Sequence, residues 1–426
     1  MPGHKGKSPY LKHPLASMYA YDITEITGAD ALFEADGIIG QSEQNAAALF
    51  GARDTLYSTE GSTLCIQTML ALAARRGKKI IAGRNAHMAF VHACILLGLE
   101  PVWLLPEQCD AYGVCGRITP EQVEQALRAH PDAAAVYITS PDYLGNTAEI
   151  GRIAEECERA GVPLLCDNAH GAYLRFTGED VHPLQQGVTM CCDSAHKTLP
   201  VLTGGAYLHL GGCCPFTKEE AKLTMNLFGS TSPSYLILQS LDLCNRYLFD
   251  RAEEDFARLK KIMQGIREEL TREQIPHLRN PVEFAKLTID LHRLGLSGDA
   301  FRVHMMKYNM ECEYYSDSYA VLLLSPFHTE TDIGALRQAL KQLPKKLEQE
   351  SVCCAYTLPS RKLFPHEAYW MEAEEIPVEQ AVGRIAAQTV AACPPGVPVV
   401  MPGEQVTEQI KNICKNGGNL SLKVVK

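Results

Sequence analysis

Short apolar runs alternate with longer amphipathic segments through the first half of the chain. Strand-like runs are predicted at residues 54–58, 79–82, 101–105, 134–139, 162–167 and 205–210. Helix-like segments are predicted at residues 44–50, 60–74, 88–97, 120–130 and 149–160. Strands that are apolar throughout and separated by amphipathic helices are typical of a parallel sheet covered on both faces. The pattern therefore predicts an α/β fold with a mostly parallel central sheet flanked by helices.

The pattern changes toward both ends of the chain. Two helices are expected at 236–248 and 252–270, followed by alternating strands and helices at 286–292, 299–308, 320–324 and 332–343, which indicate a smaller α+β domain. The prolines of the segment after Leu358 exclude a central strand and favour rigid loops. We expect an N-terminal arm (1–45), a large domain (46–280) and a C-terminal α+β domain (281–426).

Composition excludes several classes of protein. The formal net charge of −10 argues against a nucleic-acid partner and weakly favours a cationic substrate. The 16 cysteines include no Cys-x-x-Cys pair, so we expect no metal site. The N-terminus lacks the apolar segment of a signal peptide, and the longest apolar stretch, Met88–Leu99, is too short for a bilayer. A cytoplasmic protein with free thiols and no membrane contact is expected.

Candidate chemistry gathers near the ends of two strand-like runs. Lys197 lies in Ser194-Ala-His-Lys-Thr-Leu-Pro200, shortly before the run at 205–210, and the run at 162–167 ends in Asp167-Asn-Ala-His170. An enzyme that uses pyridoxal 5'-phosphate (PLP) needs a lysine to hold the cofactor and a carboxylate for its ring nitrogen. We interpret Lys197 and Asp167 in these roles, and His170 could reach the ring's phenolic oxygen. Either motif alone would be weak evidence, because surface lysines and capping aspartates are common.

Two further motifs fit the same cofactor. Glu60-Gly-Ser-Thr63 opens a predicted helix, where backbone N–H groups, hydroxyls and the helix dipole favour a phosphate. Ser62 or Thr63 could equally be an ordinary helix cap. His87 follows the strand at 79–82, where open α/β sheets bind their ligands, and could stack on the cofactor ring. A capping or surface histidine is the alternative.

Together these stretches resemble PLP enzymes of the aspartate-aminotransferase fold (fold type I), and within them the Orn/Lys/Arg decarboxylase family. The resemblance covers nearly the whole chain and has its marks at Pro2-Gly-His-Lys5, Asp22-Ile-Thr-Glu25, Arg84-Asn-Ala-His87, Asp167-Asn-Ala-His-Gly171, Ser194–Pro200, Thr231-Ser-Pro-Ser-Tyr235, Pro394-Pro-Gly-Val-Pro398 and Pro402-Gly-Glu404. Because the chain starts at the first of these motifs, it looks like the short form that lacks an N-terminal wing domain.

The resemblance implies a role for each candidate residue. Lys197 would be the Schiff-base lysine, Asp167 the partner of the ring nitrogen and His87 the stacking ring, and the small Ala169 would let the ring lie flat. The remaining cofactor-binding residues would hold phosphate: Ser62, Thr63 and His196, with Thr231 and Ser232 reaching the phosphate of a neighbouring subunit in a homodimer.

The implied reaction is decarboxylation of arginine, lysine or ornithine, with Lys197 or His87 returning a proton to the α-carbon. An aldolase or aminotransferase reaction remains open because fold alone does not determine chemistry. A non-catalytic regulatory homologue is the third alternative, and the presence of both Lys197 and Asp167 argues against it. Glu313 and Asp317 are candidates for binding the substrate's distal cation, although surface acids are common.

The chain departs from the family pattern at several positions. Glu60 stands where asparagine is usual, Met88-Ala89 replaces Lys-Ser, Asn168 replaces the glutamate of Asp-Glu-Ala-His, His366 replaces arginine and Cys393 replaces tyrosine. These changes leave the expectation of cofactor binding in place and bear on the choice of substrate.

Overall fold

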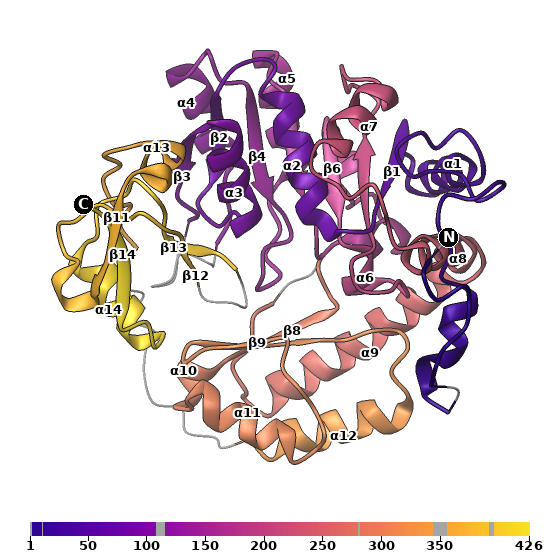
Figure 1. Ribbon diagram of the computed structural model, residues 1–426. Coiled ribbons are helices and arrows are strands. Elements are labelled where there is room, and N and C mark those ends of the chain that lie inside the picture. Colours follow the sequence, from indigo (N-terminus) through magenta and orange to yellow (C-terminus); the bar gives the residue numbers. More distant parts are fainter. Residues whose placement is uncertain (1, 11, 108–115, 280–281, 344–355, 392–395) are drawn as a thin grey trace.

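The computed structural model describes residues 2–10, 12–107, 116–279, 282–343, 356–391 and 396–426. Its centre is a seven-stranded sheet with the order β1-β7-β6-β5-β4-β2-β3 (Figure 1). The strands are β1 Asp54–Ser58, β2 Lys79–Gly83, β3 Glu100–Leu104, β4 Ala135–Thr139, β5 Leu164–Asp167, β6 Met190–Asp193 and β7 Ala206–Leu210. Within this sheet β7 is antiparallel to both of its neighbours, while β2 to β6 pair in parallel. The predicted mostly parallel sheet is confirmed.

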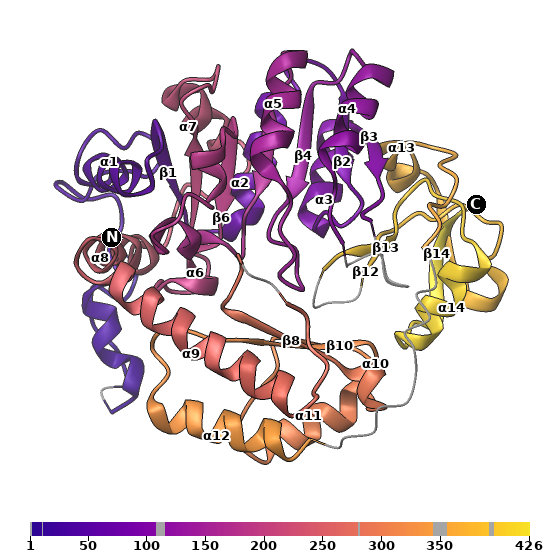
Figure 2. The same ribbon diagram turned by 180° about the vertical axis from the view of Figure 1, so that it is seen from behind.

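Helices cover both faces of this sheet (Figures 1 and 2). One face carries α2 Gly61–Ala73, α3 Met88–Leu97 and α7 Lys218–Asn226, and the other carries α4 Pro120–Ala129 and α5 Ile150–Ala160. Successive strand residues point to opposite faces, so Tyr137 joins the core beneath α2 and α3 while Val136 and Ile138 join the core beneath α4 and α5. Burial on both faces explains why the strands are apolar throughout.

A smaller α+β unit lies below the large sheet in Figure 1. Its strands are β8 Lys286–Asp290, β9 Tyr314–Tyr315 and β10 Tyr319–Leu323, in the order β8-β10-β9. Its helices are α10 Leu291–Leu294, α11 Gly298–Met306 and α12 Glu330–Lys341, and the long α9 Ala252–Arg272 packs with them in one core. The strands and helices predicted at 286–292, 299–308, 320–324 and 332–343 are present with shifted bounds, whereas α10 and β9 were not predicted.

Two side chains of β8 dock this small sheet onto the large one. Lys286 Nζ donates to the carbonyl of Asp142 at 2.8 Å, and Thr288 Oγ1 donates to the carbonyl of Leu144 at 2.9 Å. Both side chains are buried, and burial lowers the pKa of Lys286 to about 8. The two carbonyls lie in the loop that follows β4, so the docking contacts hold a loop at the end of the large sheet.

The segment after residue 356 contains regular structure that the sequence did not predict. It holds α13 Pro365–Trp370, α14 Glu408–Asn416, a sheet of β11 Ala373–Pro377 with β14 Ser421–Val425, and a sheet of β12 Val390–Ala391 with β13 Pro398–Val400. The prediction of rigid loops was wrong here. Among the described residues, Pro377 and Pro398 stand in strands of two-stranded sheets, which have no central strand.

Helix α1 Ile38–Phe50 begins earlier than the predicted Gln44. Its first N–H groups are capped from outside the local sequence, because the carboxylate of Asp30 accepts hydrogen bonds from Gly37, Ile39 and Gly40. The structure also adds α6 Ala195–Thr198, and α8 Tyr235–Asp250 confirms the helix predicted at 236–248. In the described part of the chain, no helix combines the length and the apolar character needed to cross a bilayer. The division into an arm and two domains stays a prediction.

A buried ion pair joins the C-terminal segment to the large sheet. Arg84 follows β2, and its Nη2 lies 3.3 Å from Glu404 Oε2, while Nη1 donates to the carbonyl of Pro398 at 2.7 Å. Glu404→Ala leaves this buried guanidinium without its counter-charge, so we expect a loss of about 3 kcal/mol or more in unfolding free energy, measured by urea denaturation. Glu372→Ala, which removes an exposed partner of Lys426, should cost less than about 0.5 kcal/mol. Equal losses in the two variants would contradict this role of the buried pair.

Candidate active site

A cavity of about 190 Å³ lies at the carboxyl ends of β2, β4 and β5. Its walls come from the large sheet, the small sheet and the C-terminal segment, and its lining residues are Ser62, Asn85, His87, Thr139, Pro141, Tyr143, Asp167, Ala169, His170, Lys197, Glu313, Gly396 and Val397. Open α/β sheets bind ligands at this edge. The structure therefore brings Lys197, Asp167, His87, His170 and Ser62 together in one place.

Lys197 and His170 form a hydrogen-bonded pair in this cavity. Lys197 lies on the single turn α6 that follows β6, and its Nζ is 3.0 Å from His170 Nε2. Burial lowers the pKa of Lys197, an effect that the charges of Asp167 and Glu313 oppose. Burial, followed by the charge of Lys197, holds the pKa of His170 well below its usual range. A neutral His170 accepts at Nε2 from Lys197, which leaves the proton of His170 on Nδ1.

Asp167 is the last residue of β5 and is buried. Tyr137 donates its hydroxyl to Oδ2 at 3.0 Å, the Ala169 N–H donates to Oδ1 at 3.2 Å, and the Cys192 thiol lies 3.7 Å from Oδ1. These donors fix the orientation of the carboxylate. A buried carboxylate of this kind suits a cationic partner such as a protonated ring nitrogen.

His87 caps α3 and also lines the cavity. Its Nδ1 accepts the Ala89 N–H at 3.1 Å, so the neutral ring carries its proton on Nε2. Burial lowers the pKa of His87, which keeps the ring neutral. Gly396 closes the wall beside this ring, because a Cβ at that position would stand 2.7 Å from His87 Nε2. His87 is therefore a helix cap, as the alternative interpretation of the sequence had it, and it also lines the cavity.

The expected phosphate residues separate into two groups. Ser62, in the first turn of α2, lines the cavity, and the Ser194 hydroxyl donates to its Oγ at 2.8 Å. Thr63 and His196 are not among the lining residues: Thr63 is exposed, and His196 Nδ1 lies 3.0 Å from the Gly205 carbonyl. Phosphate binding by these two residues remains a prediction.

Thr231 and Ser232 are exposed on the loop between α7 and α8. This loop is joined to the start of α2, because Glu60 Oε1 accepts the Ser230 N–H at 2.6 Å. The carboxylate of Glu60 is thus engaged by a loop N–H. The reach of Thr231 and Ser232 into a neighbouring subunit remains a prediction.

Two other departures from the family pattern are described by the structure. The Met88 N–H donates to the Gly396 carbonyl at 2.8 Å, which ties the start of α3 to the C-terminal segment. His366 lies on α13, with its ring stacked on Phe364 at 6.0 Å between centroids, and does not line the cavity. Cys393 lies outside the described residues.

Several residues that line the cavity were not predicted from the sequence, and the choice between Glu313 and Asp317 was left open. Asn85 and Thr139 stand at the ends of β2 and β4, so the rule that placed His87 could also have found them. Tyr143 donates its hydroxyl to Glu313 Oε1 at 3.0 Å and meets the His170 ring edge-on at 5.0 Å. Glu313 lines the cavity, whereas Asp317 is exposed and accepts the Gly298 N–H.

Unpaired polar atoms in the walls are compatible with PLP. Asn85 Oδ1, Thr139 Oγ1 and His170 Nδ1 are buried without a hydrogen-bond partner among the described residues. Buried polar atoms usually find a partner, so these three suit a ligand with several polar groups. The small side chain of Ala169 leaves room for a flat ring beside Asp167.

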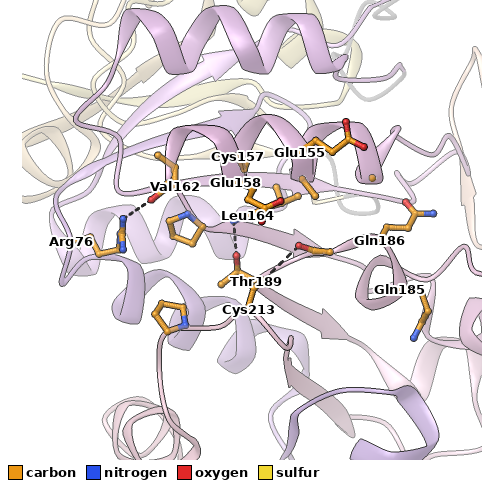
Figure 3. Close-up of a pocket in the computed structure, with 16 residues that line it drawn as sticks. Arg76, Glu155, Cys157, Glu158, Val162, Leu164, Gln185, Gln186, Thr189 and Cys213 are labelled. Carbon is orange, nitrogen blue, oxygen red and sulfur yellow. Dashed lines mark hydrogen bonds between the residues drawn. The ribbon is translucent and has the colours of Figure 1, made fainter.

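A larger cavity of about 640 Å³ lies at the opposite ends of β5 and β6, beside α5 (Figure 3). Its charged lining residues are Arg76, Glu155 and Glu158, of which Arg76 donates to the Gly161 carbonyl. None of the residues interpreted as catalytic or cofactor-binding lines it. Volume alone is therefore a poor guide to the site here.

Known proteins match this chain over most of its length. The major domain of Orn/Lys/Arg decarboxylases matches residues 1–332, and the C-terminal domain of the same family matches residues 347–416. The chain is 30% identical to the arginine decarboxylase of Bacillus subtilis (strain 168), over 98% of this chain and 89% of that protein. It is 30% identical to the arginine decarboxylase of Halalkalibacterium halodurans, over 96% and 87%.

Solved structures support the same fold. The structure of the E. coli constitutive lysine decarboxylase superposes with a TM-score of 0.80 at 20% identity, over 100% of this chain and 79% of that chain. The lysine decarboxylase A of Pseudomonas aeruginosa gives a TM-score of 0.81 at 19% identity, over 100% and 78%. With both family domains matched in order along the sequence, the chain belongs to the PLP-dependent Orn/Lys/Arg decarboxylase family.

Proposed function

We propose that this protein decarboxylates a basic amino acid, with arginine as the first candidate, using PLP held on Lys197. The observation that carries the proposal is the convergence of the Lys197 amine, the Asp167 carboxylate and the His87 ring on one cavity. PLP, when bound, supplies an electron sink for the carbon that loses CO2. The relatives at 30% identity that are named arginine decarboxylases support arginine.

Each residue of the site would have a separate role in binding the cofactor or moving a proton. Asp167, fixed by Tyr137 and Ala169, would keep the ring nitrogen protonated. His170, with its proton on Nδ1, would donate to the phenolic oxygen, and Ser62 at the start of α2 would bind phosphate. A proton on the α-carbon would replace the departing carboxyl group. Lys197 Nζ and His87 Nε2 are the two candidate donors of this proton, because both residues line the cavity.

Glu313 is the proposed acceptor for the distal cation of the substrate. It enters the cavity from the small sheet, opposite the large-sheet residues, and the Tyr143 hydroxyl holds its Oε1. A carboxylate in a partly enclosed site forms strong charge-assisted hydrogen bonds with a guanidinium or ammonium group. Its position therefore supports a substrate with a cation at the end of a side chain.

Glu313→Gln tests this assignment. It keeps the shape and one acceptor but removes the charge, so we expect kcat/KM for the preferred substrate to fall about ten- to hundredfold, mainly through a higher KM. Glu311→Gln, at an exposed position of the same segment, is the matched control and should change little. A KM in Glu313→Gln equal to that of wild type would exclude Glu313 from substrate binding.

The reaction itself is tested by measuring CO2 release from arginine, lysine and ornithine with the purified protein. Release from at least one of them, with formation of the corresponding amine, is expected. A protein that binds PLP but releases CO2 from none of the three would favour the aldolase or aminotransferase alternative. The absence of PLP binding would favour the non-catalytic homologue.

We also propose a homodimer that completes the phosphate site. The exposed Thr231 and Ser232 beside the start of α2 support it. Apolar side chains exposed on the neighbouring arm and helices, Ile26, Ile38 and Leu243, support burial of this face against a second copy. Sedimentation velocity should give a mass of twice the chain or more, and a monomer with full PLP affinity would contradict the proposal.

A further inference from the structure

A buried carboxylate lies four residues before Lys197 in the sequence and takes no part in the roles described above. Asp193 is the last residue of β6 and has no solvent-exposed surface. Its Oδ1 accepts from Asn168 Nδ2 at 2.7 Å, with the Cys191 thiol 3.7 Å away. Its Oδ2 lies 2.9 Å from His182 Nε2 and 3.2 Å from His209 Nε2. Donors from β7, from the residue that follows β5 and from the loop before β6 therefore converge on one carboxylate.

The partners of the two histidines assign their tautomers. His182 Nδ1 accepts the Leu184 N–H. His209 Nε2 faces the Asp193 carboxylate, which only accepts, and burial lowers the pKa of His209, so its neutral ring leaves Nδ1, 2.8 Å from Thr55 Oγ1, to accept the hydroxyl. Each ring therefore carries its proton on Nε2 and donates it to Asp193. His182, Asp193 and His209 could by spacing hold a metal ion, but with both Nε2 protons turned toward the carboxylate they form a hydrogen-bonded cluster instead.

This cluster connects the two strand ends that carry the central residues of the site. Asn168 directly follows Asp167, and its N–H also donates to the Cys192 carbonyl at 3.0 Å. Asp193 directly precedes Ser194, whose hydroxyl reaches Ser62, and the turn that bears Lys197. Gly171 leaves the space that the Asn168 side chain needs, because a Cβ on that glycine would stand 2.0 Å from Asn168 Oδ1.

We propose that Asn168 and Asp193 are positioning residues: a charge-matched pair that holds the ends of β5 and β6 together and so places Asp167 against Lys197. This inference rests on the proposed PLP binding by those two residues. It accounts for the departure at position 168, because a glutamate there would bring a second carboxylate against the buried Asp193. Only one of the two positions, 168 or 193, can therefore hold a carboxylate, and in this chain it is position 193.

Exchanging the two side chains tests the pair. Asn168→Asp places two carboxylates together, and we expect PLP affinity to fall about tenfold or more, with a lower urea midpoint.

The double variant Asn168→Asp/Asp193→Asn restores a single carboxylate. The amide introduced at position 193 can donate to the carboxylate introduced at position 168, while the oxygen of that amide accepts from both histidines. The PLP dissociation constant of the double variant should return to within about threefold of wild type. Asp180→Asn, which makes the same chemical change at an exposed position, is the control and should bind PLP as wild type does.

Absorbance titration with PLP and urea unfolding of the full-length chain give the readouts, and neither depends on substrate. Should Asn168→Asp fail to fold, recovery of a folded, PLP-binding double variant supports the pair equally. An Asn168→Asp protein that binds PLP like wild type, or a double variant no better than that single variant, overturns it. Failure of the proposed function is distinguishable, because it would appear as absent PLP binding in the wild-type protein.

Discussion

Lys197→Ala is expected to abolish the visible absorption band of protein-bound PLP and to lower kcat by about 10⁴-fold or more. The side chain is the amine that reaches the cavity from α6, and it also donates to His170, so its removal takes away both the covalent attachment and a proton donor. The absorption band is read from the purified protein before any substrate is added. Turnover is then measured as CO2 release.

The control for Lys197→Ala is Lys260→Ala, which removes a lysine on α9 that pairs with Glu179 at the surface. This control should keep both the band and the turnover. A Lys197→Ala protein that retains the band would show that another group holds the cofactor, and the central assignment would be wrong.

Asp167→Ala is expected to bind PLP poorly and to lose about 10³-fold or more in kcat/KM. The change removes the carboxylate that faces the ring nitrogen in this proposal and leaves the Tyr137 hydroxyl and Ala169 N–H without their acceptor. PLP affinity is measured by titration of the cofactor-free protein, and turnover at saturating PLP separates binding from chemistry. Asp250→Ala, at an exposed position, should resemble wild type. Unchanged turnover in Asp167→Ala would remove Asp167 from the mechanism.

The bounds of an element can be predicted from sequence when the residues next to its two ends carry start and stop signals. The predicted bounds of α3 match the structure because His87 caps it and Gly98 follows its last apolar residue. The start of α1 is missed because its cap is Asp30, which is brought to the helix by the fold of the arm. Strand β6 is missed because its four residues, Met190–Asp193, include two cysteines and show no period. Its identity as a strand depends on pairing with β5 and β7.

The same distinction applies to the site. Asp167, His87 and Ser62 stand at strand ends or a helix start, which sequence patterns reveal, whereas Lys197 was found by its motif because β6 and α6 were not predicted. Glu313 could not be separated from Asp317 by sequence, because both occur in one short acidic segment. Their different positions arise from the packing of the small sheet against the large one, a contact between residues far apart in the chain.

The docking of the two sheets through Lys286 and Thr288 has a consequence for substrate selection. Lys197 belongs to the large sheet and Glu313 to the small one, so under the proposed roles the two ends of the substrate are bound by separate layers. The distance between the two binding groups would then select substrates by their length. The β8 contacts with the Asp142 and Leu144 carbonyls set this distance. Ornithine, lysine and arginine differ in side-chain length. Substitutions at that docking surface should therefore change which of them is preferred without altering any group that touches them.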